Sequence, residues 1–179
     1  MSERKVVLYI SMSIDGFLAT KDDGLDWLSI VQAEGADYNY TAITERVDTY
    51  IVGRVTYDTV MKLTGGEFPQ ATKYNCFVVT RQDRAPENGV TFYNGDLEKL
   101  ISKLKAEPGK DIYCDGGGQV VQMLMEKNLI DEYIISVIPI FLGDGKRLFL
   151  GGVKQLDVTP HESTYYPETG LVQLRYTKV

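Results

Sequence analysis

Residues 112–119, IYCDGGGQ, run from an apolar stretch through three glycines into a helical pattern. Residues 51–56, IVGRVT, have the same form: an apolar run, a glycine and the start of a helix. The free N–H groups and the dipole of a helix N-terminus attract anions, and glycine lets a phosphate approach because it has no Cβ. Glycine also occurs in such turns for steric reasons alone. Two such turns in one chain nevertheless favour an open α/β sheet that binds a phosphorylated ligand at the carboxyl ends of its strands.

The rest of the chain alternates between the two-residue period of strands and the 3.6-residue period of helices. Strands are predicted at residues 5–13, 49–52, 75–80, 90–93, 111–114, 131–142, 155–165 and 171–177. Helices are predicted at residues 28–47 with a break near Gly35, at 56–63, after an N-cap at Asp96, and at 119–128. Residues 167–170, PETG, are typical of a hairpin turn. This order predicts one α/β domain over residues 1–179, with a mostly parallel sheet and an antiparallel hairpin at its C-terminal end.

The composition argues against several classes of function. The 19 basic and 25 acidic residues give a net charge of −6, so nothing electrostatic favours nucleic acid or an anionic membrane as a partner. One histidine, His161, and no C-x-x-C motif leave nothing for a histidine or cysteine metal site, and they argue against a Ser-His-Asp hydrolase. No apolar run reaches the roughly 18 to 20 residues of a membrane span, and no signal-peptide segment is seen. We therefore expect a cytoplasmic protein whose Cys76 and Cys114 are buried, reduced thiols.

Two arginines narrow the choice of ligand. Neither glycine turn is a Walker A sequence or a G-x-G-x-x-G fingerprint, and the nearest spacing, at residues 143–145, has no helix start after it. The strand that ends at Thr80 brings Arg81 to the same edge of the sheet as Arg54. A carboxylate at that edge would bind the ribose 2′-hydroxyl of NADH, whereas arginine accommodates a 2′-phosphate. Arg81 alone would be an ordinary surface residue, but together with Arg54 and Thr56 it favours NADPH over NADH.

Four motifs, in order along the chain, resemble a known family. Residues 53–57, GRVTY, resemble the Gly-Arg-x-Thr-aromatic motif of the dihydrofolate reductase superfamily, and residues 115–120, DGGGQV, resemble its triple-glycine turn. Residues 13–19, SIDGFLA, and 139–145, PIFLGDG, resemble more specifically the reductase domain at the C-terminus of the bifunctional riboflavin-biosynthesis deaminase-reductase. The resemblance implies a three-layer α/β sandwich with NADPH bound across a twisted sheet, a substrate pocket beside the first strand, and a homodimer.

The resemblance also implies roles for individual residues. The cofactor-binding residues would be Gly53, Arg54, Thr56, Thr80, Arg81, Gly116, Gly117, Gly118, Gln119 and Val120. Of these, Arg54 and Thr56 would hold phosphates at a helix start, and Thr80 and Arg81 would flank the adenosine 2′-phosphate. Gly116–Gly117 would be a cis peptide, and the three residues after it would offer backbone contacts to the pyrophosphate.

The substrate side of the site is predicted from the first strand and the loop after it. Asp15 is the candidate catalytic residue, which would orient the substrate or manage the proton, although Asp-Gly is also an ordinary turn sequence. Tyr9, Ser13 and Asp15 are candidate substrate contacts near the nicotinamide. Trp27 is a fourth, because it could stack on a flat ring; a role as a core anchor is the alternative.

Three departures from the family bear on the substrate. Dihydrofolate reductases proper carry a carboxylate a few residues after a loop tryptophan, but here Gln32 stands at that place. The riboflavin enzyme has a lysine on its first strand where this chain has Tyr9, and the zinc-deaminase signature is absent. The sequence thus predicts a stand-alone NADPH-dependent reductase of a small heterocycle, of the 5-amino-6-(5-phosphoribosylamino)uracil reductase type. Dihydrofolate reductase activity and a non-catalytic NADPH-binding module are the alternatives.

Overall fold

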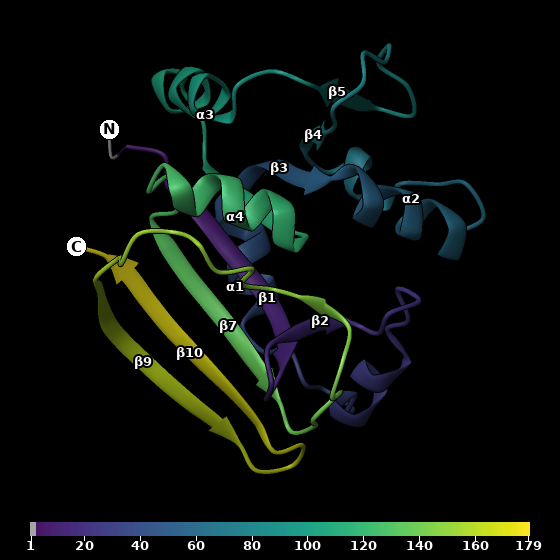
Figure 1. The fold of residues 1–179 in the computed structure, drawn as a ribbon, viewed down its shortest axis with the longest axis vertical. Coiled ribbons are helices and arrows are strands. Elements are labelled where there is room, and N and C mark those ends of the chain that lie inside the picture. The colour runs from purple at the N-terminus through teal and green to yellow at the C-terminus, as the bar shows by residue number, and fades with distance from the viewer. Residues whose placement is uncertain (1–2) are drawn as a thin grey trace.

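The computed structural model describes residues 3–179, whose main feature is an eight-stranded sheet with the order β5-β4-β3-β6-β1-β7-β10-β9 (Figure 1). Its strands are β1 (Val6–Ser13), β3 (Val47–Gly53), β4 (Asn75–Val79), β5 (Val90–Tyr93), β6 (Asp111–Gly116), β7 (Glu132–Ile138), β9 (Val158–Tyr166) and β10 (Leu171–Lys178). A separate two-stranded sheet joins β2 (Phe17–Ala19) to β8 (Lys146–Arg147). The helices are α1 (Tyr40–Arg46), α2 (Arg54–Leu63), α3 (Leu97–Ala106) and α4 (Gly118–Glu126), with 3-10 turns at Asp26–Val31 and Pro69–Thr72.

The strand directions confirm the predicted α/β fold. Strands β5, β4, β3, β6, β1 and β7 are parallel to their neighbours. Strand β10 pairs antiparallel with both β7 and β9, and the β9–β10 turn spans residues 167–170 as predicted. The predicted N-cap is also present, because the Asp96 carboxylate accepts the amide of Glu98 at 2.8 Å.

Two predicted elements are shorter than expected. The helix predicted at residues 28–47 was wrong, because only the 3-10 turn and α1 are helical there and β3 already begins at Val47. Tyr38 and Asn39 have φ of +49° and +63°, a left-handed conformation that no helix continues through. The strand predicted at residues 131–142 ends at Ile138, because Pro139 has no N–H to donate to a neighbouring strand.

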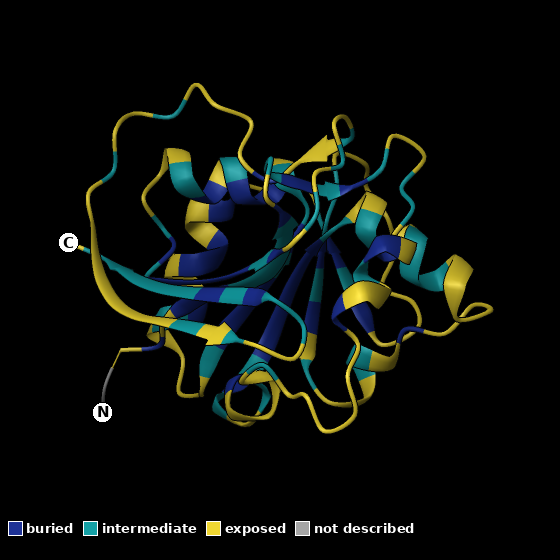
Figure 2. Cartoon of the chain, turned by 90° about the horizontal axis from the view of Figure 1, so that it is seen from below, coloured by how far each residue is buried: buried dark blue, intermediate teal, exposed yellow. Residues whose placement is uncertain are grey.

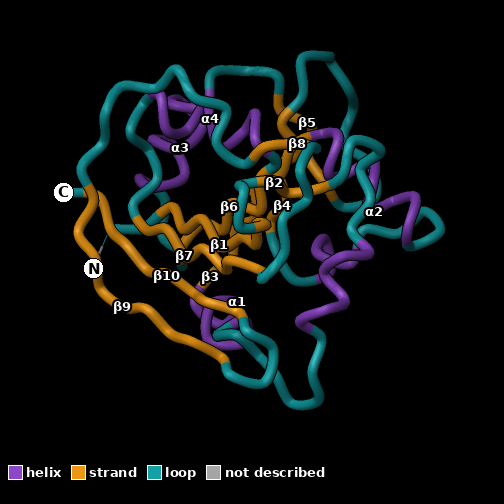
Figure 3. Tube along the Cα trace, turned by 60° about the horizontal axis from the view of Figure 1, so that its bottom comes forward, coloured by secondary structure: helices purple, strands orange, loops and turns teal. Residues whose placement is uncertain are grey.

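Helices cover the sheet on both faces (Figure 3). Helices α3 and α4 bury their apolar sides against β1, β3 and β6, in the cluster that contains Leu8, Ile51 and Cys114. The opposite face of the sheet packs against α2 through Tyr57, and against α1 through Ile43. The strands at the centre are therefore mostly buried, whereas β9 at the edge is exposed along most of its length (Figure 2). Cys76 and Cys114 are buried free thiols, as predicted.

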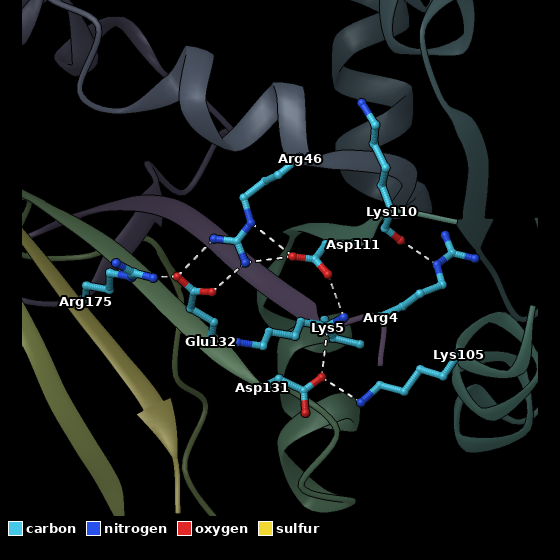
Figure 4. A network of polar contacts seen from close by, with 10 residues as sticks. Arg4, Lys5, Arg46, Lys105, Lys110, Asp111, Asp131, Glu132 and Arg175 are labelled. Carbon is cyan, nitrogen blue, oxygen red and sulfur yellow. Dashed lines mark hydrogen bonds and ion pairs between the residues drawn. The ribbon is translucent and has the colours of Figure 1, made fainter. Parts of the chain in front are cut away.

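A network of ion pairs joins the strands near their amino ends (Figure 4). Glu132, whose side chain is fully buried, accepts hydrogen bonds from Arg46 and from Arg175, each at 2.7 Å. Burial raises the pKa of Glu132, but the bonds from the two arginines outweigh it and hold the pKa below its usual value. The same balance, with Lys105 and Lys178 as partners, lowers the pKa of Asp131. Because both folded-state pKa values are depressed, these groups stabilise the fold at neutral pH and lose that contribution as the pH falls through them.

Within residues 3–179, no helix has both the length and the apolar character needed to cross a membrane.

Candidate functional site

A cleft of about 1560 Å³ opens at the carboxyl ends of β1, β3, β4 and β6. Ordinary ligand pockets measure about 300 to 1,000 Å³, so this one has room for a dinucleotide together with a small second molecule. Nine of the ten predicted cofactor residues line it: Gly53, Arg54, Thr56, Thr80, Arg81, Gly117, Gly118, Gln119 and Val120. The tenth, Gly116, is buried behind the turn. The structure thus brings together residues that the sequence separates by more than sixty positions.

The two glycine turns touch each other inside the cleft. A Cβ on Gly53 would lie 3.2 Å from Val120 Cγ2, and one on Gly117 would lie 3.3 Å from Thr56 Oγ1. Gly53 and Gly117 are the N-caps of α2 and α4, and neither helix has a side chain that caps its first amides. Two sets of backbone donors therefore face one space, with a helix dipole behind each. The Gly116–Gly117 peptide is cis, as the family resemblance implied.

Arg54 and Arg81 add positive charge to the same cleft. Arg54, the first residue of α2, has a side chain 46% exposed and pairs with Asp58 one turn along the helix. Arg81 follows β4 and is exposed. Both guanidinium groups are therefore open to a ligand at the end of the cleft formed by β3 and β4.

Ser13 and Asp15, predicted as substrate contacts, are used within the protein. The Ser13 hydroxyl donates to Asp15 at 2.6 Å, and the Asp15 carboxylate also accepts the amides of Leu142 and Gly143. Partial desolvation raises the pKa of Asp15, but these hydrogen bonds outweigh it and leave the pKa below its usual value. Neither residue is among those that line the cleft. The geometry gives Asp15 the work of anchoring the loop after β7, and its catalytic role stays a prediction.

Tyr9 and Trp27 have different positions. Tyr9 lines the cleft, and its hydroxyl donates to the carbonyl of Tyr38 at 2.8 Å. Trp27 is only 8% exposed and packs with Val31, Ile138 and Leu171 in the core. The alternative of a core anchor therefore describes its surroundings, and Trp27 is not among the cleft residues.

Three residues of the site were not singled out by the sequence patterns. Asp115, the second-to-last residue of β6, lines the cleft, and its carboxyl accepts the hydroxyls of Tyr50 and, at 3.1 Å, of Tyr113. Burial raises the pKa of Asp115 to about 6, against the opposing effect of the two hydrogen bonds. The only signal in the sequence was the position of Asp115 inside the triple-glycine motif, since Tyr50 and Tyr113 had the appearance of packing residues in apolar strands.

The wall opposite the glycine turns was also unforeseen. Residues 143–147 line the cleft, and β8 pairs with β2 after the first strand. The guanidinium carbon of Arg147 lies 4.6 Å from the centre of the Phe17 ring, which fixes this side chain over the small sheet. The sequence pointed to this loop only through its glycine spacing at residues 143–145.

The family model for the RibD C-terminal domain matches residues 4–171 of the chain. The protein belongs to the RibD C-terminal domain family. Two Bacillus subtilis (strain 168) members, both named only as uncharacterized proteins, are similar in sequence. YwjB is 43% identical over 82% of this chain and 83% of its own, and YyaP is 28% identical over 98% of this chain and 96% of its own.

Solved structures of RibD-type proteins share the fold. A candidate riboflavin biosynthesis protein from Shewanella sp. PV-4 superposes with a TM-score of 0.86 at 31% identity, covering 98% of this chain and 99% of that one. A diaminohydroxyphosphoribosylaminopyrimidine deaminase/5-amino-6-(5-phosphoribosylamino)uracil reductase from Thermotoga maritima gives 0.72 at 13% identity. It matches 99% of this chain and 57% of its own length, and at that identity it shows the fold alone. The chain is thus a RibD-type reductase domain by family and by architecture.

Proposed function

We propose that the protein is an NADPH-dependent reductase that transfers hydride to a small heterocyclic substrate of the 5-amino-6-(5-phosphoribosylamino)uracil type. The observation that carries this proposal is the meeting of two uncapped helix N-termini and two arginines in one cleft. This donor set suits a dinucleotide with an additional phosphate, because backbone amides bind a pyrophosphate and guanidinium groups bind a phosphate monoester. Membership of a reductase family supports the same reading.

The residues of the cleft would divide the work along its length. The amides at the starts of α2 and α4 would hold the pyrophosphate, and Arg54 and Arg81 the adenosine 2′-phosphate. Anchoring the phosphorylated end fixes the position of the other end, where the cofactor supplies the hydride. Tyr9 would form part of the floor at that end, with its hydroxyl already held by Tyr38.

The cofactor assignment predicts a preference for NADPH that depends on Arg81. Replacing Arg81 by alanine removes a guanidinium that would pair with the 2′-phosphate, so we expect NADPH to bind about tenfold more weakly, as for the loss of about 1.4 kcal/mol. NADH binding should hardly change. Thermal shift and fluorescence titration with both cofactors measure this, with Arg84→Ala as the control, because Arg84 lies in the same loop but outside the cleft. Equal affinities of the wild type for NADPH and NADH would contradict the assignment.

The reaction itself is tested by NADPH oxidation against a panel of ribosylaminopyrimidines, with and without a 5′-phosphate, and of dihydropterins. We expect turnover with a phosphorylated ribosylaminopyrimidine. Turnover with dihydropterins alone would favour dihydrofolate reductase activity. NADPH binding without any turnover would favour a non-catalytic module.

We further propose that the partner of this chain is a second copy of itself. Strand β9 supports this, because it ends the sheet and presents Val158 and Tyr165, the latter 63% exposed. Sedimentation velocity at micromolar concentration should give twice the 20.1 kDa of one chain, and Tyr165→Lys should weaken the association. A monomer at all concentrations would contradict this proposal.

A further inference from the structure

We propose that Asp115 is the proton donor of the reduction and that Tyr50 and Tyr113 are the residues that position its carboxyl group. This inference rests on the reductase function proposed above. It gives a role to an acidic group at the cleft floor that no sequence motif assigned.

The strand register places these side chains together. Tyr113 on β6 is paired with Val7 on β1 and with Tyr50 on β3. Asp115 lies two residues beyond Tyr113, so it projects from the same face of the sheet, toward the cleft side of this row. Asp115 is also the last side chain before the Gly116–Gly117 turn. It therefore stands where the predicted phosphate-binding turn meets the floor of the cleft.

The two tyrosines hold the carboxyl group in one orientation. Tyr113 donates to one carboxyl oxygen and Tyr50 to the other. The tyrosines are themselves fixed, because their rings meet edge to face at 5.2 Å and Tyr74 stacks on Tyr50 at 6.0 Å. Asp115 keeps part of its surface open to the cleft.

No cation neutralises this acid. Within residues 3–179, no lysine, arginine or histidine forms an ion pair with Asp115. The titratable groups of the packed strands and helix around the row are Tyr50, Tyr113, Tyr9, Tyr40, Tyr74 and Cys76. Burial raises the pKa of Tyr9 and the pKa of Tyr74, and it raises the pKa of Cys76 to about 12, so these three are neutral around pH 7. An acid among such neighbours retains its proton far more readily than a salt-bridged one.

The resulting pKa of about 6 suits a general acid that works near neutral pH, because a sizeable fraction is protonated and the proton is readily released. Asp15 offers the contrast, since hydrogen bonds lower its pKa and keep it ionised. Of the two aspartates at this end of the sheet, only Asp115 lines the cleft.

The step balances with the groups already named. A hydride from NADPH adds to the carbon of a C=O or C=N bond of the substrate and leaves NADP⁺. The electron pair of that π bond moves to oxygen or nitrogen, which takes the proton of the Asp115 carboxyl. The substrate is thereby reduced by two electrons, and the Asp115 carboxylate is reprotonated by water from the open cleft.

The carboxyl is tested first without any substrate, by ¹³C NMR titration of labelled aspartate carboxyls. We expect a resonance that titrates near pH 6 in the wild type and is missing in Asp115→Asn. In Tyr113→Phe the same resonance should titrate at higher pH, because a hydrogen bond to the ionised form is lost. An Asp115 resonance with the ordinary titration of an exposed aspartate would overturn the proposal.

The donor role is tested by NADPH oxidation with the substrate found in the panel. Asp115→Asn should lower kcat at least about 100-fold, the low end for general acid catalysis, while the Kd for NADPH stays within about twofold. Asp115→Glu should recover part of the rate, and Asp157→Asn, at an exposed site outside the cleft, should have no effect. If Asp115→Asn does not fold, Tyr113→Phe decides: the pH at which kcat falls should move upward, and an unchanged profile would overturn the proposal.

The two proposals fail in different ways. An active wild type with an equally active Asp115→Asn variant overturns the donor role and leaves the reductase intact. A wild type that binds NADPH but reduces no member of the panel overturns both.

Discussion

Replacing Arg46 by methionine is expected to lower the free energy of unfolding by about 3 kcal/mol, the lower end of the cost of breaking a buried ion pair. The reason is the environment of Glu132, whose side chain is fully buried and depends on Arg46 and Arg175 for compensation. Without Arg46 the Glu132 carboxylate keeps one partner, and Asp111 loses its ion pair as well. The lower end of the range applies because the Arg46 side chain is 30% exposed, so water screens part of the interaction.

Urea denaturation of the two proteins at neutral pH measures this difference. Lys103→Met is the matched control, because Lys103 forms only a 4.0 Å surface pair with Glu107 and should change stability by less than about 0.5 kcal/mol. The penalty of Arg46→Met should shrink as the pH falls, because protonated Glu132 no longer needs a cation. A loss no larger than that of the control would show that the network contributes little to stability.

Gly118→Ala is the second change with a large expected effect. A Cβ at this position would lie 2.3 Å from the carbonyl oxygen of Arg147 and 3.3 Å from that of Leu148. Both neighbours are backbone atoms, so α4 and the β8 segment would have to move apart. We expect a loss of about 1 to 3 kcal/mol in stability, typical of overpacking, and an NADPH affinity lowered about tenfold or more, since the first turn of α4 would shift.

Thermal unfolding and NADPH titration give the two values. Gln119→Ala is the control, because Gln119 is exposed, lies one residue further along α4 and is predicted to act through its backbone amide. An alanine at position 118 that preserves both stability and affinity would mean that the close packing of α4 on β8 is not needed for the site.

The parts of the site that the sequence predicted are those formed by short local signals. The glycine turns at residues 53 and 116–118 each combine a strand end, a glycine and a helix start within a few residues. Their meeting in one cleft follows from the parallel order of the sheet, because adjacent parallel strands end at the same edge. The family resemblance added the cis peptide, which no periodicity would indicate.

The unforeseen parts depend on contacts between distant residues. The bond between Tyr50 and Asp115 joins positions 65 residues apart, and it exists only because β3 and β6 are neighbours in the sheet. Local pattern gives the order of strands along the chain but not their order in space. Likewise, the end of the helix predicted at residues 28–47 is set by the left-handed backbone of Tyr38 and Asn39, where local propensity was a poor guide.

The ion-pair network and the cleft lie at opposite ends of the same strands, and this separation has an evolutionary consequence. Because the charged groups that brace β1, β6 and β7 are at the amino ends, substitutions at the carboxyl ends can alter ligand preference without removing that bracing. Such an arrangement tolerates drift in specificity, and a designer who wished to retarget this scaffold would vary the carboxyl ends and leave the opposite pole untouched.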